Sequence, residues 1–251
     1  MDNNTRRSFI KNTVFAAAAA GLPTISIAAS DVKPMDATTD QTILFQGDSI
    51  TDGNRTRDND WNHIMGHGYQ YIISSKLWFE QPDHHFHFLN RGVSGHKVPD
   101  LAARWQTDTL DLRPDVLSIL VGVNDANEAV KGNTKFSKES YREGYRDLLD
   151  RTIQINPKVR FVICEPFLLP VGAVKTNWQR WSAEVNLRQV VAKDLAKEFD
   201  AIFVPFQSAF NNALKRAPAE YWIWDGIHPM PGGHELMARE WLKAVKKGDV
   251  I

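Results

Sequence analysis

The sequence predicts an α/β fold in which helices cover both faces of a central, mostly parallel sheet of five strands. Short apolar runs alternate with stretches of helical periodicity after residue 41, and this alternation is typical of strand-helix-strand units with right-handed crossovers. Two of the runs end at glycine-containing polar motifs, as expected where a buried parallel strand meets a site. With 251 residues, 43% of them hydrophobic and 24% charged, the chain can bury one sizeable core. These observations predict a three-layer α/β/α sandwich.

Five apolar runs are expected to form the strands: residues 42–45, 86–89, 116–121, 159–164 and 201–204. Most of these runs are nearly continuous in apolar character, which favours strands buried on both faces. The single cysteine, Cys164, ends the fourth run. We therefore expect a small buried thiol without a disulfide partner.

The clearest helix is predicted over residues 181–199. Apolar side chains recur every four residues along one face of this segment: Leu187, Val191, Leu195 and Phe199. Charged side chains are expected to point away from the core: Arg188, Lys193 and Glu198. This division is typical of a helix that packs one face against a sheet.

Residues 1–30 are predicted to be an export signal and not part of the fold. The pair Arg6-Arg7 precedes an apolar segment, residues 14–22, as in a twin-arginine signal. That segment is too short to span a bilayer, and no cysteine follows it that could carry a lipid anchor. Residues 31–41 are interpreted as a polar linker before a single domain over residues 42–251. An ordinary secretory leader is the alternative, and both interpretations predict a periplasmic or extracellular protein.

Charge and histidine spacing argue against several classes of function. The chain has 30 Lys and Arg against 30 Asp and Glu, so no long-range field would attract nucleic acid. Three histidines lie close together, His84, His85 and His87, but neighbouring strand residues face opposite sides of a sheet and are not expected to converge on a metal. We expect no metal, no cofactor, no nucleic-acid partner and no stable membrane anchor. The sequence carries no signal for an oligomeric state.

Three segments far apart in the chain contain residues suited to nucleophilic catalysis: residues 47–49, 122–125 and 225–228. A serine hydroxyl is a weak nucleophile at neutral pH, so it needs a nearby base and a carboxylate that orients this base. Ser49, His228 and Asp225 can fill these roles. The anion that forms on an attacked carbonyl oxygen needs hydrogen-bond donors. The candidates are the amides of Ser49 and Gly95 and the side chain of Asn124.

These motifs resemble those of the SGNH hydrolase superfamily, whose members are often called GDSL-type esterases. The resemblance rests on four sequence blocks: residues 47–50 (GDSI), 90–95 (NRGVSG), 122–125 (GVND) and 225–229 (DGIHP). It implies a flavodoxin-like fold, an acyl-enzyme mechanism with Ser49 as nucleophile, and the triad and oxyanion donors named above. Gly95 is implied as the donor, and Gly92 is left to form a turn. Ile50 occupies the position of leucine in the GDSL motif, which is a volume-conserving difference.

Each motif alone also has a purely structural explanation. Residues 47–49 can form an ordinary turn whose side chains cap a helix, and residues 124–125 can do the same. Asp225 and His228 can form a surface pair of small energetic value. The conjunction of four blocks in one order, on a chain of suitable length, favours the enzyme.

The substrate is suggested by residues expected at the rim of the site. Residues 54–63 form a long polar segment after the nucleophile, and loops after strands of this kind build such rims. Trp61, Trp222 and Trp224 are candidate substrate-binding residues because indole faces suit sugar rings, with core packing as the alternative. We therefore expect a small-molecule or oligosaccharide ester substrate, most specifically O-acetyl groups on carbohydrates. A lysophospholipase, a broad arylesterase and an inactive carbohydrate-binding module are the alternatives.

Overall fold

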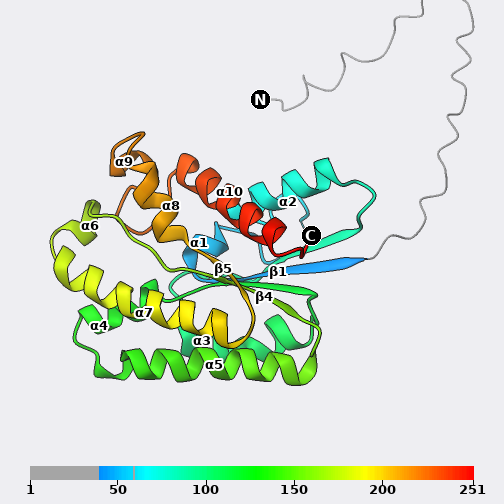
Figure 1. Ribbon diagram of the computed structural model, residues 1–251, viewed down its shortest axis with the longest axis horizontal. Coiled ribbons are helices and arrows are strands. Elements are labelled where there is room, and N and C mark those ends of the chain that lie inside the picture. The colour runs from blue at the N-terminus through cyan, green and yellow to red at the C-terminus, as the bar shows by residue number, and fades with distance from the viewer. Residues whose placement is uncertain (1–39, 59) are drawn as a thin grey trace, which may run out of the picture. The chain divides into compact units, whose positions relative to one another are not determined.

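A sheet of five parallel strands forms the centre of the computed structural model, which describes residues 40–251 apart from residue 59 (Figure 1). The strands are β1 (Gln41–Gly47), β2 (Phe86–Asn90), β3 (Val116–Leu120), β4 (Arg160–Cys164) and β5 (Ile202–Val204), in the spatial order β2-β1-β3-β4-β5. Every neighbouring pair is parallel. The predicted fold class and all five predicted strands are therefore confirmed. The predicted export signal lies outside the described residues, and β1 begins at Gln41, the last residue of the predicted linker.

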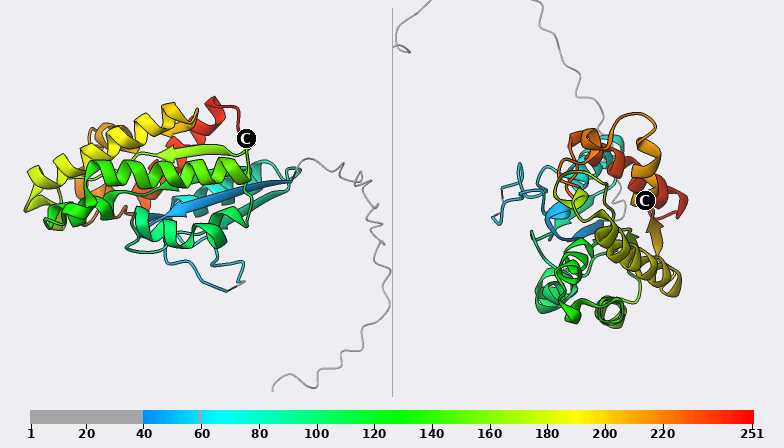
Figure 2. Two further views of the ribbon diagram at one scale, coloured as in Figure 1. Left: turned by 90° about the horizontal axis from the view of Figure 1, so that it is seen from below. Right: turned by 90° about the vertical axis from the view of Figure 1, so that its left-hand side faces the viewer.

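Helices cover both faces of the sheet. On one face lie α2 (Tyr69–Glu80), α8 (Phe206–Ala213) and α10 (Pro231–Lys247), and on the other lie α3 (Val98–Trp105), α5 (Lys138–Ile155) and α7 (Trp178–Glu198). The two further views in Figure 2 show the same two groups. Shorter helices lie in the connections: α1 (Ser49–Asp52), α4 (Val123–Val130), α6 (Gly172–Lys175) and α9 (Ala219–Trp222). A π-helical segment (Gln106–Leu110) and a 3-10 turn (Thr134–Phe136) complete the described helices.

Two apolar cores lie on opposite faces of the sheet because each strand presents side chains to both. Phe206 and Trp241 belong to one core, and Trp105 and Val191 belong to the other. Every residue of β3 is buried, as expected for a central parallel strand. The Trp241 indole donates a hydrogen bond of 2.9 Å to the hydroxyl of Ser118 in this strand, so its polar atom is satisfied inside the core.

Cys164 is a free, buried cysteine at the end of β4. Burial raises the pKa of its thiol to about 12, because the thiolate is poorly solvated there. The expectation of a small structural thiol is confirmed. A buried thiol of this kind is a poor nucleophile at neutral pH.

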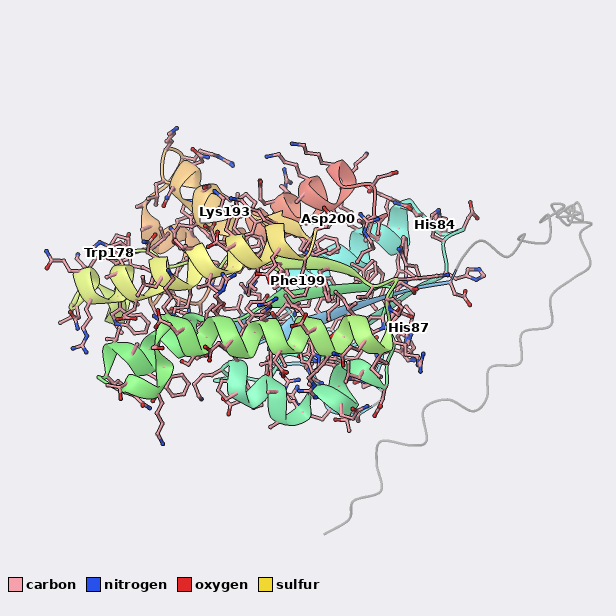
Figure 3. All side chains as sticks on the ribbon, turned by 60° about the horizontal axis from the view of Figure 1, so that its bottom comes forward. His84, His87, Trp178, Lys193, Phe199 and Asp200 are labelled. Carbon is pink, nitrogen blue, oxygen red and sulfur yellow. The ribbon has the colours of Figure 1, made fainter. Side chains whose placement is uncertain are left out.

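The predicted helix over residues 181–199 is α7, which begins earlier, at Trp178. Val191 and Leu195 are fully buried as expected, whereas Leu187 and Phe199 are only half-buried and Lys193 is exposed (Figure 3). Two of the four expected apolar positions are therefore fully buried, and Trp181 and Val185 extend the buried face toward the start of α7.

Arg188 contradicts the prediction that it points away from the core, because its side chain is fully buried. Its guanidinium donates hydrogen bonds to the Glu184 carboxylate, one turn earlier, and to the backbone carbonyl of Phe136. These partners offset the cost of taking the charge out of water. A stripe of apolar residues at a spacing of four did not reveal this polar position on the buried face.

The carboxyl ends of β1 and β3 lie side by side at the centre of the sheet, where Gly47 is the register partner of Leu120. From β1 the chain crosses to β2 on one side, and from β3 it continues to β4 on the other. Ligands of open α/β sheets bind outside the strand ends at such a reversal. The segments after Gly47 and Leu120 are the first and third sequence blocks, so the fold brings them together.

Candidate active site

Ser49 lies where β1 ends and α1 begins. The preceding Gly47 packs so tightly that an added Cβ would lie 2.3 Å from the Leu120 carbonyl oxygen, so glycine is needed for the two strand ends to approach. Asp48 accepts a hydrogen bond of 3.0 Å from the amide of Ile50 and caps the short helix. The capping explanation thus holds for Asp48 and leaves the Ser49 hydroxyl free for another partner.

The Ser49 hydroxyl meets a histidine and a carboxylate from the other end of the chain. Ser49 Oγ lies 2.8 Å from His228 Nε2, and His228 Nδ1 lies 2.6 Å from Asp225 Oδ2. Both distances are hydrogen bonds, in the order expected of a nucleophile, a base and an orienting acid. The arrangement can take a proton from Ser49 while Asp225 stabilises the imidazolium that forms.

Local hydrogen bonds hold Asp225 in this orientation. Its second oxygen, Oδ1, accepts from the amides of Ile227 at 2.9 Å and His228 at 2.7 Å. Burial raises the pKa of Asp225, but the hydrogen bonds from the amide and ring of His228 and from the Ile227 amide more than offset this, so the pKa lies below its ordinary value. The carboxylate therefore stays ionised beside the imidazole. The backbone bridge between Ile223 and Pro229 closes the loop that carries both residues.

The second and third blocks meet beside Ser49. Asn124, in the first turn of α4, donates a hydrogen bond of 3.2 Å from Nδ2 to the carbonyl of His96. Gly95 precedes His96 and has a φ of 80°, a conformation that favours glycine. Among the described residues, none accepts a hydrogen bond from the Gly95 amide. The Gly92 amide is instead occupied, because it donates to Asn90 Oδ1 at 2.9 Å. The geometry therefore favours Gly95 over Gly92 as a free donor.

Asn90 is a supporting residue that the sequence reasoning missed. It is buried, and its Nδ2 donates to the carbonyls of Thr51 at 2.7 Å and Met65 at 3.0 Å. Its Oδ1 accepts from Gly92. A single amide side chain thus ties the helix that starts at Ser49 to the turn before Gly95. The only signal in the sequence was its place at the start of the second block.

Asp52 and Arg57 form a second tie to the same turn. Asp52 Oδ2 accepts from the Ser94 amide at 3.0 Å and from Arg57 Nη2 at 2.8 Å, while Arg57 Nη1 reaches Oδ1 at 3.1 Å. Two parallel bonds between a guanidinium and a carboxylate fix orientation as well as distance. Arg57 therefore acts on the turn through Asp52. Sequence reasoning placed Arg57 in a polar rim and did not find this contact.

Known proteins share this fold. The GDSL-like Lipase/Acylhydrolase family matches residues 45–236 of the chain. The chain belongs to this family. As a member of the family with an esterase relative, it is a carboxylic ester hydrolase. The resemblance found in the sequence is confirmed.

Three relatives of this GDSL-like acylhydrolase are informative. An acetylxylan esterase of Geobacillus stearothermophilus is 31% identical over 207 residues, which are 81% of this chain and 93% of the relative. A crystal structure of an acetylxylan esterase from that organism superposes with a TM-score of 0.72 at 29% identity, covering 82% of this chain and 94% of the other. A structure described as a GDSL-like lipase from Parabacteroides merdae has a TM-score of 0.79 at 40% identity, covering 84% and 98%.

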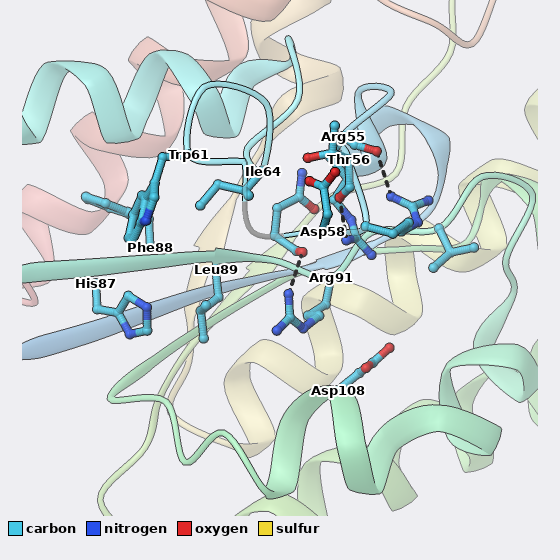
Figure 4. Close-up of a pocket in the computed structure, with 13 residues that line it drawn as sticks. Arg55, Thr56, Asp58, Trp61, Ile64, His87, Phe88, Leu89, Arg91 and Asp108 are labelled. Atoms are coloured by element: carbon cyan, nitrogen blue, oxygen red, sulfur yellow. Dashed lines mark hydrogen bonds between the residues drawn. The ribbon is translucent and has the colours of Figure 1, made fainter.

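The three candidate tryptophans lie in different surroundings. Trp224 is 61% exposed, and its ring stacks beside the His228 imidazole with centroids 6.4 Å apart. Trp222 is only 5% exposed, donates to the Ala217 carbonyl and lies under the Arg216 guanidinium. The core-packing explanation therefore applies to Trp222, whose ring faces are not open to a sugar. Trp61 is exposed at a cavity away from the triad (Figure 4).

The three neighbouring histidines do not converge. The His84 ring lies tilted against the ring of Phe86, with centroids 5.3 Å apart. His85 lies 3.2 Å from an Asp40 carboxylate oxygen, and His87 lines the cavity of Trp61. Figure 3 shows His84 and His87 apart at the edge of the sheet. Within residues 40–251 without residue 59, no cluster of three or more His, Cys, Asp or Glu side chains has the arrangement of a metal site. In the same part of the chain, no helix is both long and apolar enough to cross a membrane.

Two buried carboxyl groups lie beneath the site. One carboxylate oxygen of Asp48 and one of Asp125 meet no hydrogen-bond donor in the described part of the chain. The other oxygens accept from the amides of Ile50 and Val98. Burial raises the pKa of Asp48 to about 7 and that of Asp125 to about 6, because an ion with few partners is costly in a low dielectric. Both groups therefore favour the protonated form more than an exposed carboxyl does.

Asp48→Asn is expected to flatten the dependence of the free energy of unfolding on pH. The folded pKa of about 7 lies above the ordinary value of 3.8, so the folded state holds a proton that the unfolded state has released. Stability contributed by this group is therefore lost as the pH rises from about 4 to about 7. Asparagine keeps the acceptor for Ile50 but does not titrate. Urea unfolding of both proteins from about pH 4 to about pH 8 measures the difference.

The exposed Asp111, changed to asparagine, is the matched control and should keep the pH slope of the wild type. Equal slopes in the wild type and in Asp48→Asn would contradict the titration of a buried carboxyl group at this position.

Proposed function

We propose that the protein is an exported serine esterase that removes O-acetyl groups from carbohydrates through Ser49, His228 and Asp225. The observation that carries the proposal is the continuous hydrogen-bonded chain from Ser49 Oγ to His228 Nε2 and from His228 Nδ1 to Asp225, at 2.8 and 2.6 Å. The roles are supported by the order of the three groups and by the ionised state of Asp225.

The reaction begins when Ser49 Oγ attacks the carbonyl carbon of the ester and His228 Nε2 takes the hydroxyl proton. The carbonyl oxygen becomes an anion that accepts hydrogen bonds from the amides of Ser49 and Gly95 and from Asn124 Nδ2. His228 then gives its proton to the sugar oxygen as the ester bond breaks. Water attacks the acyl-enzyme by the same route, releasing acetate and restoring the serine.

The choice of substrate rests on the rim and on the relatives. The exposed Trp224 ring beside His228 offers an apolar face where a sugar can stack next to the reacting ester. The comparisons by sequence and by structure both include an acetylxylan esterase from Geobacillus stearothermophilus. Export is supported by the arginine pair and apolar segment within residues 1–30. Oligosaccharides that carry short-chain O-acyl groups are therefore the proposed substrates.

The preferred acyl chain is expected to be acetyl. Each methylene bound in an apolar groove contributes about 0.8 kcal/mol, so a site built for long chains would show kcat/KM rising from acetate to octanoate. A deacetylase, as the acetylxylan esterase relative is named, should show the reverse trend. We expect p-nitrophenyl acetate to have the highest kcat/KM in the series and octanoate to be poor.

Trp224→Ala provides the second measurement on the same site. The change should lower kcat/KM for an acetylated xylooligosaccharide more than for p-nitrophenyl acetate, because only the larger substrate reaches the indole face. Tyr71→Ala, a change of an exposed aromatic residue on α2, is the control. A steady rise of kcat/KM with chain length, together with hydrolysis of lysophospholipid, would instead establish the lysophospholipase alternative.

A further inference from the structure

A cavity of about 770 Å³ lies between the segment after α1 and the edge strand β2, and the triad residues do not line it (Figure 4). Three arginines line it, Arg55, Arg57 and Arg91, together with the exposed indole of Trp61. The lining residue Val93 lies two positions before Gly95, so the cavity and the proposed oxyanion donor Gly95 share the second sequence block.

Two of these arginines have no carboxylate partner among the described residues. Arg57 is neutralised by Asp52 at 2.8 Å, and the lining carboxylate of Asp108 is neutralised by Arg104 at 2.9 Å. No ion pair involves Arg55 or Arg91 within the described part of the chain. The exposed Asp58 is the remaining acidic side chain of the lining, and its Oδ1 accepts from the Asp60 amide.

Arg55 is held at the cavity wall by the second block. Its Nε donates to the carbonyl of Gly92 at 3.0 Å, and its Nη1 donates to the carbonyl of Thr56, the next residue, at 3.4 Å. Burial, together with the positive charges of Arg57 and Arg91, lowers the pKa of Arg55 to about 10. The guanidinium is still charged at neutral pH, so this part of the wall carries a positive charge that an anion would stabilise.

We propose that this cavity is a subsite for an acidic sugar residue, with its carboxylate bound by Arg55 and Arg91 and its ring packed against Trp61. Guanidinium groups match the planar, two-oxygen geometry of a carboxylate, and an exposed indole face suits the apolar face of a pyranose. The inference rests on the proposed function and narrows it: the natural substrate is an acetylated glycan that carries uronic acid units.

The test is calorimetric binding to the Ser49→Ala protein, which removes turnover. Two xylooligosaccharides of equal length are compared, one with a glucuronic acid branch and one without. The acidic oligosaccharide is expected to bind at least about tenfold more tightly, as for hydrogen bonds between charged groups. Added salt should reduce this preference, because the charges lie at an open cavity. Equal affinity for the two oligosaccharides overturns the proposal, and this outcome does not depend on any arginine variant.

Arg55→Gln and Arg91→Gln, each made in the Ser49→Ala protein, assign the preference to the cavity. Each is expected to reduce the preference to about twofold or less, whereas Arg151→Gln, on the exposed side of α5, should keep it. Two arginine variants are used so that a folding defect in one, seen by thermal unfolding, leaves the other informative. A preference that survives both changes places the acidic sugar elsewhere and overturns the proposal.

Free glucuronate and inorganic sulfate distinguish a sugar subsite from a general anion site. Glucuronate should displace the acidic oligosaccharide at a lower concentration than sulfate does, since only glucuronate can also pack against Trp61. Sulfate as effective as glucuronate overturns the assignment to a sugar. Ester hydrolysis does not enter these measurements, so their failure leaves the deacetylase proposal to be judged by its own experiments.

Discussion

Ser49→Ala is expected to lower kcat/KM for p-nitrophenyl acetate by at least about 10⁴-fold, because the acyl-enzyme can no longer form. His228→Ala should have an effect of similar size, since no other base lies within hydrogen-bond distance of Ser49 in the described residues. Asp225→Asn should leave a small residual activity, because misorienting the base lowers turnover less than removing the base does. Steady-state kinetics of the three variants, with circular dichroism to show that each is folded, provide the measurement.

Ser182→Ala is the matched control for the nucleophile, because Ser182 lies on α7. Among the residues that the structure describes, its hydroxyl bonds only to the Gln179 carbonyl one turn earlier. It should keep wild-type turnover and should still react with a fluorophosphonate probe. Ser49→Ala should not be labelled by this probe. Wild-type activity in Ser49→Ala would exclude Ser49 as the nucleophile.

Asn124→Ala is expected to lower kcat by about a hundredfold to a thousandfold while KM changes little. The physical reason is that the amide meets full negative charge only in the tetrahedral state, so its contribution is larger there than in the bound ester. The hydrogen bond from Asn124 to His96 suggests a second, smaller effect through the turn that contains Gly95. Measuring kcat and KM separately distinguishes the two.

Asn124→Asp should be more damaging than Asn124→Ala, because it puts a negative charge where an anion develops. Asn212→Ala, an exposed change on α8, is the control and should leave both constants unchanged. If KM rises in Asn124→Ala while kcat holds, Asn124 binds substrate and does not stabilise the oxyanion.

Much of the fold followed from the sequence because parallel strands are buried on both faces. The run at residues 116–121 is continuous in apolar character, and β3 is buried along its whole length. The boundaries were less certain, since β1 extends to Gly47 where the apolar run stops at Phe45. Arg188 was misplaced because helical periodicity reports hydrophobicity, whereas a buried charge depends on partners such as Phe136 that are distant in sequence.

The meeting of the three candidate side chains could be predicted from the sequence, whereas the residues that support them could not. Ser49, Asp225 and His228 stand in recognisable motifs, and the fold brings them within hydrogen-bond distance. The hydrogen bond from the Ser94 amide to Asp52 depends on how two segments distant in sequence meet in space. The pattern of residues within either segment does not reveal this contact. The burial of Trp222 could not be predicted either, because the sequence does not show whether a tryptophan beside a motif faces the core or the solvent.

Acetate release from an acetylated xylooligosaccharide tests the central claim most directly. Proton NMR follows free acetate and the acetyl signals on the sugar at the same time, with wild-type protein and Ser49→Ala protein in parallel. We predict that the wild type releases acetate and leaves the glycosidic bonds intact, and that Ser49→Ala releases none above the rate without protein. No acetate from any acetylated oligosaccharide, by a wild-type protein that hydrolyses p-nitrophenyl acetate, would contradict the assignment as a carbohydrate deacetylase.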